Sequence, residues 1–192
     1  MSPLVGVVGE TGDVLAIRAR AGNASPRSKL ASFLDECVAA IPEPWRSSRQ
    51  AWIEIDSAGY SRPVIDAVTA HSAAFSITCG NDKEVRAAIY ELATGTETTW
   101  VPALSADGEL AGSEVAECRY RFAGRELRMI VRRQRKSAGS QLAFDDLGGW
   151  RFHAIVTNIP AIFCDIATIE QRTACAAVRQ RKRSASSSTT SE

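Results

Sequence analysis

The sequence lacks the features that mark several common protein classes. It has no Cys-x-x-Cys pair. Its five cysteines are Cys37, Cys79, Cys118, Cys164 and Cys175. Their wide spacing argues against a zinc site or a disulfide framework and indicates free thiols in a reducing, cytoplasmic setting. The two histidines, His71 and His153, are not near a serine or cysteine at catalytic spacing, and we expect His153 to be structural.

Long hydrophobic runs and a dominant charge are also absent. The apolar stretch from Leu4 to Val8 ends at Gly9-Glu10 and has no basic leader, so we expect neither a signal sequence nor contact with a membrane. The 23 basic and 22 acidic side chains give a net charge of +1, which by itself indicates no polyanionic partner. Residues 125–136 differ, because they contain six basic residues and a single acid, Glu126. This composition predicts a local positive surface.

The beginning of the chain predicts a hairpin followed by a helix. Leu4–Val8 and Val14–Arg20 are rich in β-forming residues and flank a short connection with two glycines, which indicates an antiparallel hairpin. Ser25-Pro26 is a helix start signal, and apolar residues then recur at helical spacing until Pro42.

The next segment predicts a strand, a helix and a second strand. The strands are expected over Ala51–Asp56 and Ala73–Cys79, and Ser61-Arg62-Pro63 opens the helix between them. Such a unit is typical of a parallel crossover. Asn81–Glu84 then predicts the start of another helix. Residues 1–93 therefore form an α/β unit.

From Thr94 onwards the pattern changes to short β runs separated by turns. The expected strands are Thr98–Leu104, Ser113–Phe122, Glu126–Gln134, Gln141–Phe144 and Arg151–Asn158. Residues 94–158 thus predict a small antiparallel sheet inserted after the α/β unit. Residues 159–170 return to apolar, helical sequence, and residues 171–192 have no apolar face and are expected to be disordered.

Asp56 is the most informative residue for function. It ends an apolar strand and precedes Ser57-Ala58-Gly59, so the strand fixes its position while the loop leaves its oxygens open to a divalent metal. Glu54 alternates with Asp56 on the strand and is a candidate second ligand. An Asp in this position also commonly serves as a turn former or a helix N-cap, and that alternative stays open. Asp145-Asp146 precedes a glycine pair and indicates a turn.

Four segments together resemble the DDE group-1 transposases of bacterial insertion sequences. They are Ile53–Gly59, Trp100–Leu104, Ile130–Arg133 and Arg151–Asn158, within a match running from about Leu4 to Glu170. The resemblance implies that residues 1–93 are a partial RNase H-like core, a mixed sheet with helices. Residues 94–158 would be an inserted small antiparallel β lobe, and residues 159–170 would return towards the core.

In that family two Asp and one Glu hold Mg²⁺ ions that drive the cleavage and transfer of DNA strands. The resemblance matches Asp56 to the second Asp, which makes it the catalytic and metal-binding candidate. The first Asp would lie upstream of Met1. The Glu would lie on a helix shortly after Glu170, followed seven residues later by a Lys, and the sequence from Gln171 onwards lacks that pattern.

A frameshift near codon 171 would explain the missing helix. Back-translation of residues 171–192 with GC-rich codons, read two nucleotides later, can give a segment with Arg, Glu and Lys in the expected order. One Asp would bind Mg²⁺ too weakly to support catalysis. We therefore expect a truncated transposase that is inactive alone, and Mg²⁺ that is not stably bound. The alternatives are a fragment that binds DNA or intact transposase subunits, and a pseudogene product without function.

The resemblance also implies that the basic strand lies near transposon-end DNA. Arg128 and Arg132 share one face of the predicted strand, and Arg133 and Arg151 could extend a phosphate-binding surface. The competing interpretation is an edge strand that its charges protect from aggregation.

Overall fold

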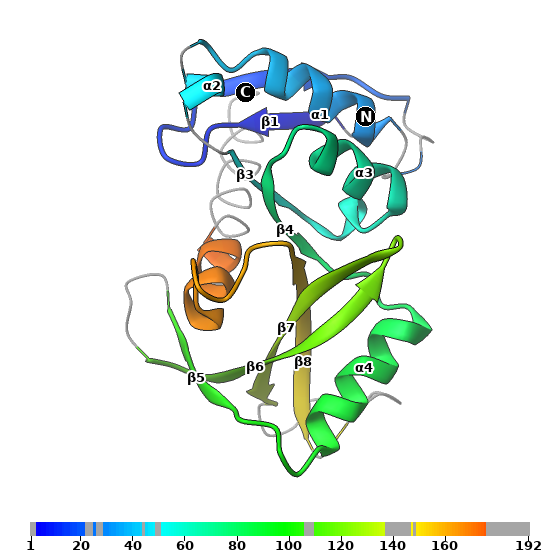
Figure 1. Cartoon of the computed structure of the whole chain (residues 1–192), viewed down its shortest axis with the longest axis vertical. Helices are drawn as coiled ribbons and strands as arrows, with labels where there is room; N and C mark the ends of the chain where they lie inside the picture. The colour runs from blue at the N-terminus through cyan, green and yellow to red at the C-terminus, as the bar shows by residue number, and fades with distance from the viewer. Residues whose placement is uncertain are drawn as a thin grey trace, which may run out of the picture.

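The computed structural model describes residues 3–21, 25, 29–43, 45–48, 51–105, 110–136, 147 and 149–175. The labelled elements are β1 (Leu4–Val7), β2 (Val14–Arg18), α1 (Leu30–Ala39), α2 (Trp45–Ser48), β3 (Trp52–Ile55), the 3-10 turn η1 (Ser57–Gly59), α3 (Arg62–Ala70), β4 (Ala74–Thr78), α4 (Lys83–Thr94), β5 (Val101–Leu104), β6 (Leu110–Phe122), β7 (Arg125–Arg135) and β8 (Trp150–Thr157) (Figure 1). Residues 166–175 are also helical and are drawn in orange at the end of the coloured chain.

The N-terminal hairpin is confirmed, and the helix after it begins later than predicted. β1 and β2 pair antiparallel as a two-stranded sheet. α1 begins at Leu30 rather than at Ser25-Pro26, because Lys29 has a left-handed backbone (φ 60°) that interrupts helical geometry. Arg18 of β2 fixes this position by donating hydrogen bonds to the Lys29 carbonyl at 2.9 Å and to Ser32 Oγ at 2.8 Å. Residues 26–28 lie outside the described part.

The strand, helix and strand that follow are confirmed, including their parallel pairing. β3 and β4 run parallel, with Trp52 opposite Ala74 and Ile55 opposite Ile77. α3 begins directly after Ser61, and its apolar face is buried. α4 begins where predicted, because the Asp82 carboxylate accepts a hydrogen bond of 2.9 Å from the Val85 amide.

The strands of residues 94–158 extend the core sheet instead of forming a separate one. The six strands have the order β3-β4-β8-β7-β6-β5, and β8 lies antiparallel to β4. Among the described strands, the β3–β4 pair alone is parallel, so the sheet is mixed, and it is strongly curled (Figure 1). β5 to β8 pair antiparallel, as expected, and they are continuous with the core sheet, because Ser76–Thr78 pair with Ile155–Thr157. The predicted strand Gln141–Phe144 lies outside the described residues.

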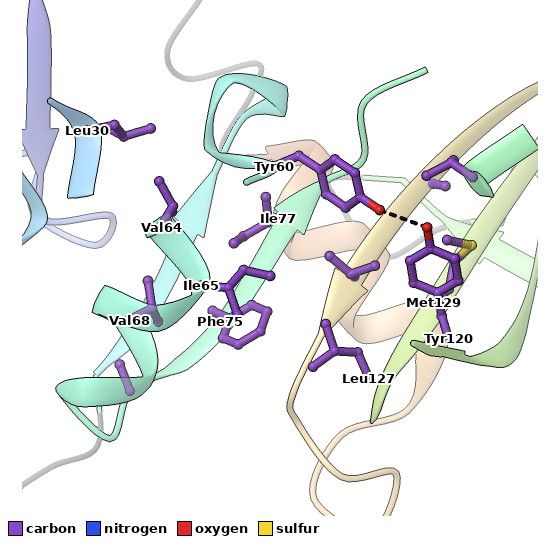
Figure 2. Close-up of a cluster of buried hydrophobic side chains, with 14 of the residues drawn as sticks. Leu30, Tyr60, Val64, Ile65, Val68, Phe75, Ile77, Tyr120, Leu127 and Met129 are labelled. Atoms are coloured by element: carbon purple, nitrogen blue, oxygen red, sulfur yellow. Dashed lines mark hydrogen bonds between the residues drawn. The ribbon is translucent and has the colours of Figure 1, made fainter. Parts of the chain in front are cut away.

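The face of the sheet that packs on α3 and α4 holds the main core, shown in Figure 2. Phe75 and Ile77 of β4 are fully buried there beside Ile65 of α3 and Met129 of β7. The β6–β7 hairpin turns at Ala123-Gly124, both with positive φ (54° and 79°), as the right-handed twist of a two-residue hairpin requires.

A tyrosine pair joins the segment after β3 to this hairpin. The hydroxyls of Tyr60 and Tyr120 lie 2.9 Å apart within the core (Figure 2). The Tyr60 ring also stacks on Phe122 with a centroid separation of 4.3 Å. Burial raises the pKa of both phenols, with the largest effect on Tyr60, so both remain protonated hydrogen-bonding groups.

The last helix corrects the predicted start of the disordered tail. Gln171–Cys175 continue the helix that begins at residue 166, and Thr173 is buried. Ile166, Ile169 and Thr173 keep helical spacing across the predicted boundary. Glu170 lies on the same side of the helix and is the polar exception. No helix in the described part is both long and apolar enough to cross a membrane.

Asn158 offers a test of the junction between the two halves of the sheet. Its side chain accepts a bond of 2.8 Å from the Phe75 amide and donates one of 3.0 Å to the Ala73 carbonyl. Asn158→Ala leaves both backbone groups without these partners, and we expect it to lower the free energy of unfolding by about 1–2 kcal/mol. Urea unfolding followed by circular dichroism measures this, with the exposed Asn81→Ala as control. Equal stability of the two variants would contradict the role of Asn158.

Candidate functional site

The face of the sheet opposite the main core is covered by the helix of residues 166–175. We call it the helix-covered face. Ile169 of the helix is fully buried against a second apolar cluster that includes Ile130 of β7 and Val115 of β6. Thr173 Oγ1 donates a hydrogen bond of 3.0 Å to Ser76 Oγ on β4. Because side chains alternate along a strand, the side chain of Glu54 on β3 also points to this face.

Asp56 lies at the carboxyl end of β3, as predicted, and acts as an N-cap. Its side chain is exposed, and Oδ1 accepts a hydrogen bond of 3.0 Å from the Ala58 amide, which opens η1. Gly59 keeps the turn tight, since a Cβ there would overlap Ile55 Cγ2. Asp56 therefore serves as an N-cap, which is the alternative to a metal ligand.

Glu54 faces a cation of the last helix. Arg172 Nε lies 3.9 Å from Glu54 Oε1, and Arg172 Nη2 lies 3.6 Å from Glu10 Oε1. The guanidinium also stacks on Trp52, 4.2 Å from the ring centroid. Arg172 thus connects the β1–β2 hairpin to β3 and places a positive charge beside the carboxylates predicted to hold a metal.

These carboxylates do not fit the two-magnesium site of the resembled family. In the described ranges, no group of three or more His, Cys, Asp or Glu side chains comes close enough to hold a metal ion. Asp56 is engaged in its cap and Glu54 faces Arg172. A two-metal reaction needs several converging oxygens, so no step of metal chemistry follows from this arrangement.

The most deeply buried charge on this face is Glu170, which the sequence did not single out. Its side chain is 1% exposed, and Arg132 Nη1 of β7 lies 2.9 Å from Oε1. Neither carboxylate oxygen accepts an aligned hydrogen bond from the described residues. Burial raises the pKa of Glu170, and Arg132 opposes this by favouring the charged form.

His153 lies beside the same arginine. It is opposite Arg132 in the β7–β8 pair, and its Nδ1 is buried without a hydrogen-bond partner among the described residues. Burial, followed by the charge of Arg132, lowers the pKa of His153, so the ring is neutral at physiological pH. His71 lies elsewhere, 2.7 Å from Asp35.

Arg128 is committed to internal contacts. Its Nε lies 2.7 Å from Glu117, and its Nη1 donates hydrogen bonds to the carbonyls of Ile159 (2.7 Å) and Cys164 (3.1 Å). The side chain is 16% exposed. Arg128 and Arg132 do share one face, as predicted, but their guanidinium groups hold the last helix and the loop before it.

Arg133 points to the opposite face of the sheet and is also paired. Its Nε donates a 2.7 Å hydrogen bond to Glu114, and its guanidinium lies over the rings of Trp100 and Trp150. Arg151 is different, since its side chain is exposed at the start of β8, opposite Gln134. Of the four predicted DNA contacts, Arg151 is the one most open to solvent.

No family model matches this chain, and no curated protein matches it.

Glu170 generates a prediction about pH. Its pKa is raised above the ordinary value of 4.5, so the folded chain holds this proton more tightly than the unfolded chain does. As the pH rises from about 4.5 through the folded pKa, the unfolded chain ionises first, and the wild type loses stability relative to Glu170→Gln. Urea unfolding from about pH 4 to about pH 8 measures this difference. Exposed Glu97→Gln controls for loss of a carboxylate. A difference that stays constant or grows in favour of the wild type as the pH rises would contradict the prediction.

Proposed function

We propose that this chain is a DNA-binding relative of the DDE group-1 transposases, with an RNase H-like core whose catalytic centre its residues do not complete. The observation that carries the proposal is the position of Asp56 at the carboxyl end of a parallel strand, followed by a β-rich segment and a helix on the same sheet. The four sequence segments that resemble the family add support. The ancestral reaction would be magnesium-dependent DNA cleavage and strand transfer.

The proposed partner is DNA and the proposed compartment is the cytoplasm. Arg151, at the start of β8, is the candidate contact for phosphate because it is exposed. Arg132 has a 31% exposed side chain but is paired with Glu170, which makes it the weaker candidate. Arg128 would support the surface indirectly, through Glu117, whereas Arg133 lies on the opposite face of the sheet and pairs with Glu114. The cysteines Cys37, Cys79, Cys118, Cys164 and Cys175 are free, which agrees with a reducing compartment.

A second candidate function is a non-catalytic fragment that binds transposase subunits. The observation in its favour is an apolar surface on the β1–β2 hairpin. Val5, Val7, Val14 and Ile17 are 41% to 64% exposed there. Contiguous exposed apolar patches are typical of protein–protein contact surfaces. Such a fragment would not shift DNA in the binding experiment below.

Catalysis is tested with supercoiled plasmid DNA. We expect the purified chain, supplied with Mg²⁺ or Mn²⁺, to nick the plasmid no faster than Asp56→Asn, because the carboxylates of the described residues do not converge. Agarose gels measure the nicked fraction over time. Metal-dependent nicking by the wild type that Asp56→Asn abolishes would overturn the proposal of an incomplete centre and would establish Asp56 as catalytic.

DNA binding is tested by gel shift on a random-sequence duplex across a potassium chloride series. Non-specific phosphate contacts predict a dissociation constant of about 10⁻⁴–10⁻⁶ M at physiological salt, weakening steeply as salt rises. Arg151→Ala should weaken binding at low salt and reduce the slope of log affinity against log salt by about 0.9. Exposed Lys83→Ala on α4 is the matched control. No shift at low salt would refute DNA binding, and equal slopes for Arg151→Ala and the wild type would remove Arg151 from the contact.

A further inference from the structure

The loop between β8 and the last helix presents two large apolar side chains to solvent. Ile162 is 87% exposed and Phe163 is 80% exposed, more than any other large apolar side chain of the described residues. We call residues 160–164 the apolar loop. Adjacent apolar side chains that are exposed to this degree are typical of a contact surface.

Hydrogen bonds within the chain hold the apolar loop in one conformation. The Phe163 amide donates a bond of 3.0 Å to the Pro160 carbonyl. Arg128 Nη1 of β7 donates bonds to the carbonyls of Ile159 (2.7 Å) and Cys164 (3.1 Å), on either side of the exposed pair. The loop is therefore fixed before any partner arrives, which lowers the entropic cost of binding.

An open hollow of about 630 Å³ lies next to the apolar loop. Leu92 of α4, Val101 of β5 and Ile166 of the last helix give it apolar walls. Glu97, which is exposed, also lines it. Sites that bury most of a drug-sized ligand measure about 300–1,000 Å³, so this hollow has room for two side chains of a partner.

The apolar loop and the hollow are neighbours and together form a self-complementary surface. Ile166 follows Phe163 by three residues, so their Cα atoms are at most about 11 Å apart. Glu117 also lines the hollow, and it pairs with Arg128, which holds the loop. A two-fold axis between a projection and a neighbouring hollow places the projection of each copy in the hollow of the other.

The charges beside the loop and the hollow are complementary as well. Arg119 lines the same small depression as Pro160, which places it beside the apolar loop, and its side chain is 89% exposed. It lies 3.9 Å from Glu126, and so loose an exposed pair is readily exchanged. Asp165, the acid next to the loop, is engaged in capping the last helix. The two-fold arrangement brings Arg119 of one copy towards Glu97 of the other.

We propose that this chain forms a two-fold dimer in which the Ile162 and Phe163 side chains of each copy insert into the hollow of the other. These two side chains offer roughly 300 Å² of exposed apolar surface. Two loops in two hollows bury on the order of 1,200 Å² in total, which is the lower limit of stable specific interfaces. One loop in one hollow buries about half of that area, so the contact is stable only when it is reciprocal. The dimer requires neither DNA nor the apolar surface of the β1–β2 hairpin.

Sedimentation velocity of the full chain tests the dimer. An interface of this size predicts a dissociation constant of about 10 μM, so the weight-average sedimentation coefficient should rise from the monomer to the dimer value around that concentration. Phe163→Ser should weaken association by about 100-fold or more, because the lost apolar contact occurs twice in the dimer. Ile17→Ser removes another exposed apolar side chain, on β2, and should leave the dissociation constant unchanged. Circular dichroism melts establish folding, and Ile162→Ser decides the matter if Phe163→Ser does not fold.

Exchange of charges tests the two-fold arrangement. Arg119→Glu and Glu97→Arg should each weaken the dimer by about threefold to tenfold, because like charges then face each other across the contact. The double variant Arg119→Glu/Glu97→Arg restores opposite charges at both sites. Its dissociation constant should return to within about twofold of the wild-type value.

Three results overturn the proposal. The first is a wild type that remains monomeric well above about 10 μM, and the second is an association that Phe163→Ser and Ile162→Ser leave unchanged. Loss of the dimer in Ile17→Ser alone would assign the contact to the β1–β2 hairpin. A double variant that stays as weak as Arg119→Glu overturns the two-fold arrangement. None of these results bears on DNA binding, which the gel shift measures separately.

Discussion

The fold depends on the antiparallel pairing of β4 with β8. Ser76 and Thr157 meet across this pair, Thr157 Oγ1 donates a 2.6 Å hydrogen bond to the Phe75 carbonyl, and Asn158 binds backbone on both sides of Ala74. These contacts satisfy main-chain groups that would otherwise lie buried and unpaired. Without them, the β3–α3–β4 unit and the long β6–β7 hairpin would each be too small to bury a core. With them, one sheet has two usable faces, one packed on α3 and α4 and the other on the last helix.

The elements whose signals are local could be predicted from the sequence, and the pairing of distant strands could not. Asp82, Ser61-Arg62-Pro63 and the glycines of the first hairpin act within a few residues, so their helix and turn signals were read correctly. The start of α1 was misplaced because Arg18, from another element, holds Lys29 and Ser32. Alternation of apolar and polar residues shows which face of a strand is buried, but it does not show which strand lies beside it. The pairing of β4 with β8 therefore could not be predicted.

The candidate site, like the fold, could be predicted only where the signal is local. The position of Asp56 at the end of β3 followed from its own strand, but the pairing of Glu54 with Arg172 depends on a helix that the sequence placed partly in a tail. The signal that could have found this helix is the spacing of Ile166, Ile169 and Thr173, which continues past Glu170. Glu170 itself breaks the apolar pattern, and a buried carboxylate is retained there because Arg132 lies opposite it.

Strand pairing also decides which basic residues remain available to a polyanion. A run of arginines in sequence suggests one positive surface, but alternate residues of β7 point to opposite faces, where acids on β6 or on the last helix meet Arg128, Arg132 and Arg133. Exposed ion pairs contribute little stability, whereas these partly buried ones are costly to break, so phosphate competes poorly for such guanidinium groups. Arg135 and Arg151 are exposed at the strand ends, but they point to opposite faces of the sheet, because Arg135 is opposite Trp150 and Arg151 is the next residue of β8. Local charge density is therefore a poor guide to a binding surface unless the cross-strand partners of each arginine are known.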